Sequence, residues 1–178
     1  MMRCWPLVIC FLLAACSQKS ADPSTSDSSG KVETHAYQIV RATTDKSFED
    51  VVEELEFAIS DHNYRITGTN NLGKALRERG NKDFPDVEVI HFCSVENARE
   101  VLQMDLGYVA MMPCRITVHV QDKKTVISLI LLPEDHPNPK VNEFARRTNA
   151  EMRRIMDFAL QQNAVGHPLP STEPAATP

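Results

Sequence analysis

Long apolar runs and an excess of basic charge are both missing from this sequence. The longest apolar stretch, at the N-terminus, falls short of the roughly 20 residues that a membrane-spanning helix needs. Lys and Arg number 19 against 24 Asp and Glu, so the formal net charge is -5. A mildly acidic chain without a basic stripe is not typical of nucleic-acid-binding proteins, and we expect no nucleic-acid partner.

The motifs of several enzyme classes are also absent. The chain contains no Gly-rich phosphate loop, no Gly-x-Ser-x-Gly and no His-Glu-x-x-His. It lacks Cys-x-x-Cys, the spacing that helps thiol oxidoreductases to lower a thiol pKa. We therefore expect a non-enzymatic protein without catalytic residues or a cofactor, and no set of residues has the spacing of a known metal site.

The N-terminus has the features of an export signal. Arg3 supplies a positive charge, and the apolar segment 5–15 follows it at the length typical of a secretory signal. Leu13-Ala14-Ala15-Cys16 resembles the lipobox of bacterial lipoproteins, in which small residues precede the cysteine that is acylated. The resemblance implies cleavage after residue 15 and a Cys16 that carries diacylglyceryl and amide-linked acyl chains, such as palmitate, as a membrane anchor.

The residue after the lipidated cysteine influences whether a lipoprotein is sorted to the inner or the outer membrane. Ser17 stands at this position, where an aspartate would retain a lipoprotein of enteric bacteria in the inner membrane. The resemblance therefore implies the outer membrane, with the domain facing the periplasm, and the inner membrane stays open.

The rest of the chain divides by composition. Residues 1–15 are the signal peptide, and the serine-rich segment 16–34 has no apolar cluster and is expected to be a flexible linker. Residues 35–163 suffice for one domain with a core of ordinary size. The Pro-rich tail 164–178 is expected to be disordered.

Periodicity along the domain predicts an α+β fold. The clearest element is a helix that Ser47 caps and that begins at Phe48. The other expected helices are 72–79, 95–104 and 139–162, and the expected strands are 36–42, 63–68, 86–93, 107–112, 114–121 and 124–132. Strands that alternate with helices and end in a hairpin predict an antiparallel sheet with helices packed on one face.

Apolar spacing also predicts which side chains face the core. In the helix 95–104 they are Val95, Ala98, Val101 and Leu102. In the last helix they are Val141, Phe144, Ala145, Met152, Ile155, Met156 and Ala159. The acidic residues of the first helix, including Glu54, form a solvated face, and the isolated histidines are expected in solvent: His35, His62, His119, His136 and His167.

Several segments resemble the family known as domain of unknown function 302. They are the first helix with Phe48 and Leu55, the segment Asn71-Leu72-Gly73-Lys74, the pair Phe92-Cys93, and above all Leu106 through Met112-Pro113-Cys114-Arg115-Ile116. The resemblance covers about residues 36–132. It implies a compact α+β fold with a curved sheet, likened to the TATA-binding-protein-like group, and it implies no activity.

The cysteines are the best candidates for chemistry. Once the signal is removed and Cys16 is acylated, only Cys93 and Cys114 remain as thiols. Each lies at the end of a predicted strand, so their sulfurs could meet if those strands are neighbours. An oxidising compartment favours a structural disulfide, and two buried thiols that fill the core are the other structural interpretation.

Two further roles for this pair stay open. Cys93 precedes the helix that Ser94 caps, where the helix dipole favours a thiolate and hence a thiol-redox role. His91, Met111 and Met112 add imidazole and thioether groups, which together with the two thiols suit a soft metal such as Cu(I). We expect a membrane-tethered binding or structural module with an unknown protein or small-molecule ligand, and a periplasmic thiol-redox or soft-metal-handling protein is the alternative. The oligomeric state is not indicated.

Overall fold

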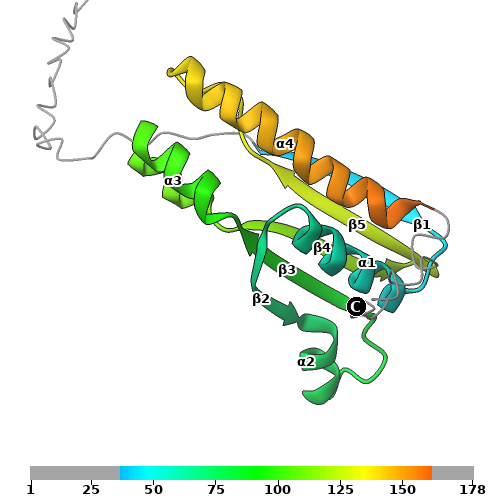
Figure 1. The fold of residues 1–178 in the computed structure, drawn as a ribbon. Coiled ribbons are helices and arrows are strands. Elements are labelled where there is room, and N and C mark those ends of the chain that lie inside the picture. Colours follow the sequence, from blue (N-terminus) through cyan, green and yellow to red (C-terminus); the bar gives the residue numbers. More distant parts are fainter. Residues whose placement is uncertain (1–36, 162–178) are drawn as a thin grey trace, which may run out of the picture. The chain divides into compact units, whose positions relative to one another are not determined.

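A computed structural model of the chain describes residues 37–161 and contains one antiparallel sheet with α1 and α4 packed across one face (Figure 1). The five strands lie in the order β1-β5-β4-β3-β2. The elements in chain order are β1 (Gln38–Thr44), α1 (Phe48–Asp61), β2 (Arg65–Asn71), α2 (Leu72–Glu78), β3 (Val87–Cys93), α3 (Val95–Met104), η1 (Leu106–Met111), β4 (Cys114–Gln121), β5 (Lys124–Leu131) and α4 (Pro139–Leu160). The predicted α+β class is confirmed.

Capping residues in the sequence explain where the helices begin. The Ser47 hydroxyl accepts a hydrogen bond from the backbone N–H three residues later at 3.1 Å, and Ser94 does so at 3.4 Å. Asn71 caps α2 in the same way at 2.8 Å. Pro139 occupies the first turn of α4, where no backbone donor is needed.

The β4–β5 hairpin is also encoded locally. Asp122 and Lys123 form its turn and both have positive φ, 51° and 63°. Two residues with positive φ are what a type I′ hairpin turn requires, and this turn twists the strands in the direction that a sheet prefers.

The core lies between the sheet and the two long helices. Along β3, Ile90 and Phe92 are fully buried on the helix side, while Val89 and His91 alternate with them on the opposite face. All seven inward residues predicted for α4 are buried. Each fully buried aliphatic or aromatic side chain of this kind contributes roughly 1.5–3 kcal/mol.

The strand predicted for residues 107–112 is wrong, because the segment Leu106–Met111 forms the 3-10 helix η1. The Asp105 side chain accepts a hydrogen bond from the N–H of Gly107 at 2.8 Å, which is the geometry of a helix start. The segment η1 packs beside α3, and it carries Tyr108 and Met111 to the end of the sheet.

Two predicted exposures are also wrong. Val95 is 72% exposed, because as the first residue of α3 it lies beyond the packed face that Val101 fills. Glu54 is only 3% exposed, because α1 turns it inward, and its carboxylate binds Lys46 Nζ at 2.6 and 2.9 Å. The ion pair lets a charged residue sit in the core.

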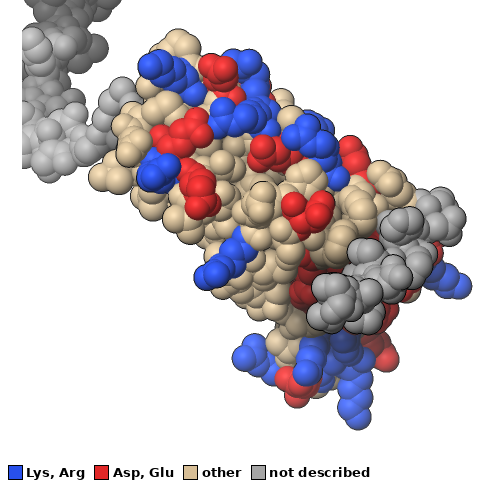
Figure 2. Space-filling view, viewed as in Figure 1, with Lys and Arg blue, Asp and Glu red and all other residues tan. Residues whose placement is uncertain are grey.

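No helix within residues 37–161 is long and apolar enough to cross a membrane. The predicted signal 1–15, Cys16 with the linker 16–34, and the tail 164–178 lie outside the described residues. On the face drawn in Figure 2, acidic and basic side chains are interspersed over α3 and α4.

Candidate functional site

Cys93 and Cys114 lie at the same end of the sheet, on neighbouring strands. Cys93 is the last residue of β3 and Cys114 the first of β4. The β3–β4 pairing sets Cys114 opposite Phe92, one residue before Cys93. Both cysteines are free thiols in this structure, so the disulfide, which is not formed here, stays a prediction.

The two cysteines line one small cavity, which we call the inner cavity. It has a volume of about 20 Å³ and lies where α3, η1 and α4 meet the ends of β3 and β4. Met111 and Met112 also line it, together with apolar side chains of α3 and α4. A space of this size accommodates one water molecule or one ion.

Two hydroxyl groups at the inner cavity have no hydrogen-bond partner among the described residues. They belong to Tyr108, which is 6% exposed, and Thr148, which is 2% exposed. A buried hydroxyl left without a partner costs roughly 1–3 kcal/mol, and such groups are few in a folded domain. Tyr108 and Thr148 both line the inner cavity, so the two unpartnered hydroxyls belong to one small region of the domain.

The other tyrosine at this cavity is fully bonded. The Tyr64 hydroxyl donates to Glu151 Oε2 at 2.7 Å and accepts from Asn97 Nδ2 at 3.0 Å. Desolvation and the bond to Glu151 raise the pKa of Tyr64 far above its usual range, so this hydroxyl keeps its proton.

Burial keeps both thiols protonated at neutral pH. Desolvation first, and the neighbouring Cys93 second, raise the pKa of Cys114 to about 12. Desolvation also raises the pKa of Cys93, even though this residue precedes the start of α3. The site is therefore one of low polarity, in which a thiolate needs a positive partner.

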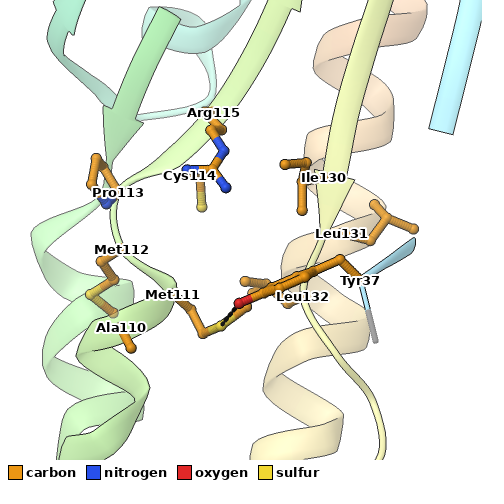
Figure 3. A pocket seen from close by; sticks show the side chains of 10 residues that line it. All are labelled: Tyr37, Ala110, Met111, Met112, Pro113, Cys114, Arg115, Ile130, Leu131 and Leu132. Atoms are coloured by element: carbon orange, nitrogen blue, oxygen red, sulfur yellow. Dashed lines mark hydrogen bonds between the residues drawn. The ribbon is translucent and has the colours of Figure 1, made fainter. Parts of the chain in front are cut away.

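A second pocket, of about 50 Å³, opens beside the inner cavity and is called the outer pocket here (Figure 3). It shares Met111, Met112, Cys114 and Leu132 with the inner cavity. Figure 3 shows the Tyr37 ring reaching across it, and the Tyr37 hydroxyl donates to the sulfur of Met111 at 3.8 Å. The two spaces therefore meet at these four residues, and Cys114 lines both of them.

A histidine–aspartate pair holds η1 over the inner cavity. His136 Nε2 lies 2.9 Å from Asp105 Oδ2, and the His136 ring packs edge-on against Tyr108 with centroids 6.5 Å apart. The prediction that His136 is solvated is wrong, since its side chain is only 22% exposed. The pair links the start of η1 to the segment between β5 and α4.

The structure brings some predicted candidates together and separates another. Cys93, Cys114, Met111 and Met112 all line the inner cavity, whereas His91 lines neither pocket. By strand alternation Cys93 shares a face of β3 with His91, while Cys114 pairs with Phe92 on the helix-covered face. In the part of the chain that the structure describes, no three or more His, Cys, Asp or Glu residues are grouped so that they could hold a metal ion.

Sequence reasoning missed Tyr108 and Thr148. The buried position of Tyr108 at the inner cavity is not predicted, because the apolar spacing of its segment predicts a strand. The spacing of α4 does indicate that Thr148 is buried, because this residue lies four positions from both Phe144 and Met152 and therefore on the inward face of the helix. A polar residue within such a stripe is a candidate for a buried site.

Comparisons with known proteins agree with this fold. The profile of the family described as "Domain of unknown function DUF302" matches residues 40–159, which extends the predicted resemblance of 36–132 through most of α4. The chain is also similar to the crystal structure of an uncharacterized conserved protein DUF302 from Bacillus stearothermophilus, with a TM-score of 0.60 and 16% identity over 69% of this chain and 98% of that chain. At this identity the likeness shows the fold alone. No curated protein matches the chain.

Proposed function

Because this chain belongs to the family described as Domain of unknown function DUF302, whose description assigns no activity, we propose its function from its own residues. It is a non-enzymatic binding module that a lipid at Cys16 tethers to the bacterial cell envelope, and its ligand site is the inner cavity. The likeness of the fold to the TATA-binding-protein-like group is part of the same proposal.

The tether is supported by the sequence alone. The apolar segment 5–15 and Leu13-Ala14-Ala15-Cys16 have the order of an export signal and a lipobox, and the serine-rich segment 16–34 supplies a spacer. More than one acyl chain is needed for stable anchoring, which the lipoprotein type of modification provides. Ser17 favours the outer membrane, with the domain in the periplasm.

The observation that carries the binding role is the pair of unpartnered hydroxyls of Tyr108 and Thr148 at the inner cavity. Apolar residues of similar shape at these two positions would avoid the free-energy cost of burying a hydroxyl without a hydrogen-bond partner. A few polar groups in a mostly apolar space are a feature of ligand sites, and the volume of the inner cavity limits its ligand to about the size of a water molecule or an ion.

A periplasmic thiol-redox or soft-metal-handling protein that uses Cys93 and Cys114 is the alternative, and the electrostatics of the site count against the redox role. A redox thiol attacks as a thiolate and therefore needs a pKa near or below ambient pH. Desolvation moves the pKa of Cys93 and of Cys114 in the opposite direction.

Fractionation of cells tests the tether. Cys16→Ser should abolish sedimentation with membranes, because the acyl chains at Cys16 are the proposed anchor. Cys4→Ser is the matched control, since it changes a cysteine of the signal that carries no lipid, and it should leave the protein in the membrane fraction. Membrane association of the Cys16→Ser protein would contradict the tether.

Native mass spectrometry of the full chain, solubilised in detergent from its own envelope, tests the ligand site. We expect wild type to carry an added mass, and we expect Ala98→Phe, which fills the inner cavity that Ala98 lines, to lose it. Absence of any added mass from wild type would contradict the binding role.

Thiol alkylation tests the redox alternative. We expect Cys93 and Cys114 in the folded protein to react with iodoacetamide at pH 7 much more slowly than in urea, because both thiols are protonated and Cys114 is enclosed. Faster reaction in the folded protein than in urea would favour the redox role.

A further inference from the structure

We propose that the uncovered face of the sheet lies against an anionic phospholipid surface, that of the membrane to which Cys16 tethers the chain. The helices α1 and α4 cover one face, and within residues 37–161 no helix is packed on the opposite one, which we call the open face (Figure 1). The proposal rests on the tether of the proposed function and is independent of the inner cavity. It gives the domain a fixed orientation on the membrane.

Strand register places three arginines on the open face. His91 faces this side from β3, and residues directly opposite each other in an antiparallel pair share a face. Arg115 of β4 lies opposite His91, and Arg65 of β2 lies opposite the last residue of β3, on the same face. Arg41 of β1 lies opposite Ser128 of β5, in a row that continues across β4 to the open face of β3. All three arginines are exposed.

No strand position on the open face carries a carboxylate. Glu88 is the only acidic residue in the five strands, and it lies on the helix-covered face, where it is 8% exposed. In the part of the chain that the structure describes, no carboxylate pairs with the three arginines, whereas Arg147 on α4 binds Glu100. Lys124, at the end of the face, is paired with Asp45 at 3.0 Å. The open face is therefore the basic side of a chain whose formal net charge is -5.

The type and the spread of these charges favour a surface that bears phosphates. All three unpaired cations are arginines, whose planar guanidinium group binds phosphate through two parallel hydrogen bonds. They lie on β1, β4 and β2, and β1 and β2 are the two edges of the sheet, roughly 19 Å apart at the usual strand spacing. One small anion cannot contact side chains so far apart, whereas the laterally mobile headgroups of a membrane can meet each of them.

The start of β1 adds apolar and aromatic contact where the tether joins the domain. Tyr37 and Ile39 are 55% and 60% exposed, and Ile39 lies on the open face two residues before Arg41. Tyrosine is enriched at membrane–water interfaces, because its ring is apolar at one end and polar at the other. Twenty residues separate Cys16 from Tyr37, and a chain of this length spans at most about 70 Å. An anchor at Cys16 therefore keeps the face within reach of the bilayer, where a weak contact suffices.

The contact should be weak and sensitive to salt. Each basic side chain close to an anionic membrane strengthens association by roughly fivefold, so three arginines contribute about 100-fold. In about 1 M salt, screening shortens the range of such charges to about 3 Å. High salt should therefore release the open face while the acyl chains stay inserted, which separates the two contributions.

The experiment measures the reactivity of histidines in the full lipidated chain, reconstituted into vesicles of phosphatidylcholine alone or with added phosphatidylglycerol. His91 and His119 lie on the open face, whereas His62 ends α1 on the helix-covered side, and all three are partly exposed. Diethyl pyrocarbonate acylates accessible imidazole groups, and peptide mass spectrometry gives the rate at each histidine. On vesicles with phosphatidylglycerol, we expect His91 and His119 to react several-fold more slowly in about 10 mM salt and to recover in about 1 M salt. The rate at His62 should not change.

Two matched triple variants distinguish the open face from net charge. A variant without the arginines of the open face should lose the protection: Arg41→Gln/Arg65→Gln/Arg115→Gln. The control Arg146→Gln/Arg153→Gln/Arg154→Gln removes the same charge from exposed positions of α4 and should keep it, because acidic and basic side chains are interspersed there (Figure 2). Urea unfolding of both variants checks the fold, and the recovery of wild type in high salt tests the proposal without any substitution.

Two results would overturn the proposal. One is equal reactivity of His91 and His119 on both kinds of vesicle, and the other is loss of protection in the α4 variant as well. Protection in the native envelope but not on phosphatidylglycerol vesicles would assign the open face to an acidic protein and overturn the membrane assignment.

The tether is judged separately, by flotation with vesicles of phosphatidylcholine alone, which carry no net charge. A chain that does not float with them lacks the tether. The open face is then judged by flotation with phosphatidylglycerol vesicles in low salt, and failure to float there would overturn the second proposal too.

Discussion

The side chain of Asn149 binds both backbone groups of Leu132. Its Oδ1 accepts from the Leu132 N–H at 2.8 Å, and its Nδ2 donates to the Leu132 carbonyl at 3.0 Å. Leu132 follows the last residue of β5 and lines both the inner cavity and the outer pocket. One buried asparagine of α4 therefore fixes the cavity wall relative to the core helix.

Replacement of Asn149 by Leu should be strongly destabilising. The substitution leaves the Leu132 N–H and carbonyl buried without partners, and each such group costs roughly 1–3 kcal/mol. We expect the free energy of unfolding, measured with urea, to fall by about 2–5 kcal/mol. Arg153→Ala, an exposed change on the same helix, is the control and should stay within about 0.5 kcal/mol of wild type. A loss below about 1 kcal/mol for Asn149→Leu would mean that the two hydrogen bonds between Asn149 and Leu132 contribute little to the stability of the domain.

Replacement of Thr148 by Val should stabilise the domain. The two side chains have similar shape, and the exchange removes a buried hydroxyl without a partner. We expect a gain of roughly 1 kcal/mol in the free energy of unfolding. Differential scanning calorimetry of wild type and variant measures it, and a clear loss of stability would show that the hydroxyl is bonded in solution.

Asp105 should contribute stability that disappears in acid. The hydrogen bond from the Gly107 N–H first, and the bond to His136 second, hold the pKa of Asp105 below its usual value. A carboxyl whose pKa is lowered by folding stabilises the protein above its unfolded pKa of about 4 and loses this effect as pH falls through the folded pKa. Wild type should therefore exceed Asp105→Asn in stability at pH 7, and the difference should shrink at pH 3.

Urea midpoints at pH 7, 5 and 3 measure this difference. Asp83→Asn, a change in the exposed segment between α2 and β3, is the control and should show little dependence on pH relative to wild type. A constant difference between wild type and Asp105→Asn at all three pH values would contradict the role of the ionised carboxylate.

Much of the fold could be predicted because its signals are local. The Ser47 cap and the apolar stripe of α4 need no knowledge of the rest of the chain, and the turn at Asp122 and Lys123 is similarly local. Segment 107–112 could not be assigned in this way. The spacing of its apolar residues fits a strand. The segment forms a 3-10 helix instead, because the Gly107 N–H donates to the Asp105 side chain and the segment packs on α3.

The site was predictable only in part. The ends of β3 and β4 place Cys93 and Cys114 near each other, and that follows from strand order. The inner cavity depends on how α3, η1 and α4 pack over these ends, which no local pattern encodes. For the same reason the sequence gives no sign that Tyr108 joins the cysteines, or that His91 is separated from the inner cavity.

The state of the two thiols in the native envelope tests the central claim most directly. Cells are quenched in acid, the full chain is unfolded in the presence of iodoacetamide, and the peptides that contain Cys93 and Cys114 are analysed by mass spectrometry without reduction. An inner cavity lined by two free thiols, as in this structure, predicts that both cysteines are alkylated in most of the protein. A single cross-linked pair of peptides joined through Cys93 and Cys114, with no alkylated form, would show a structural disulfide and contradict it.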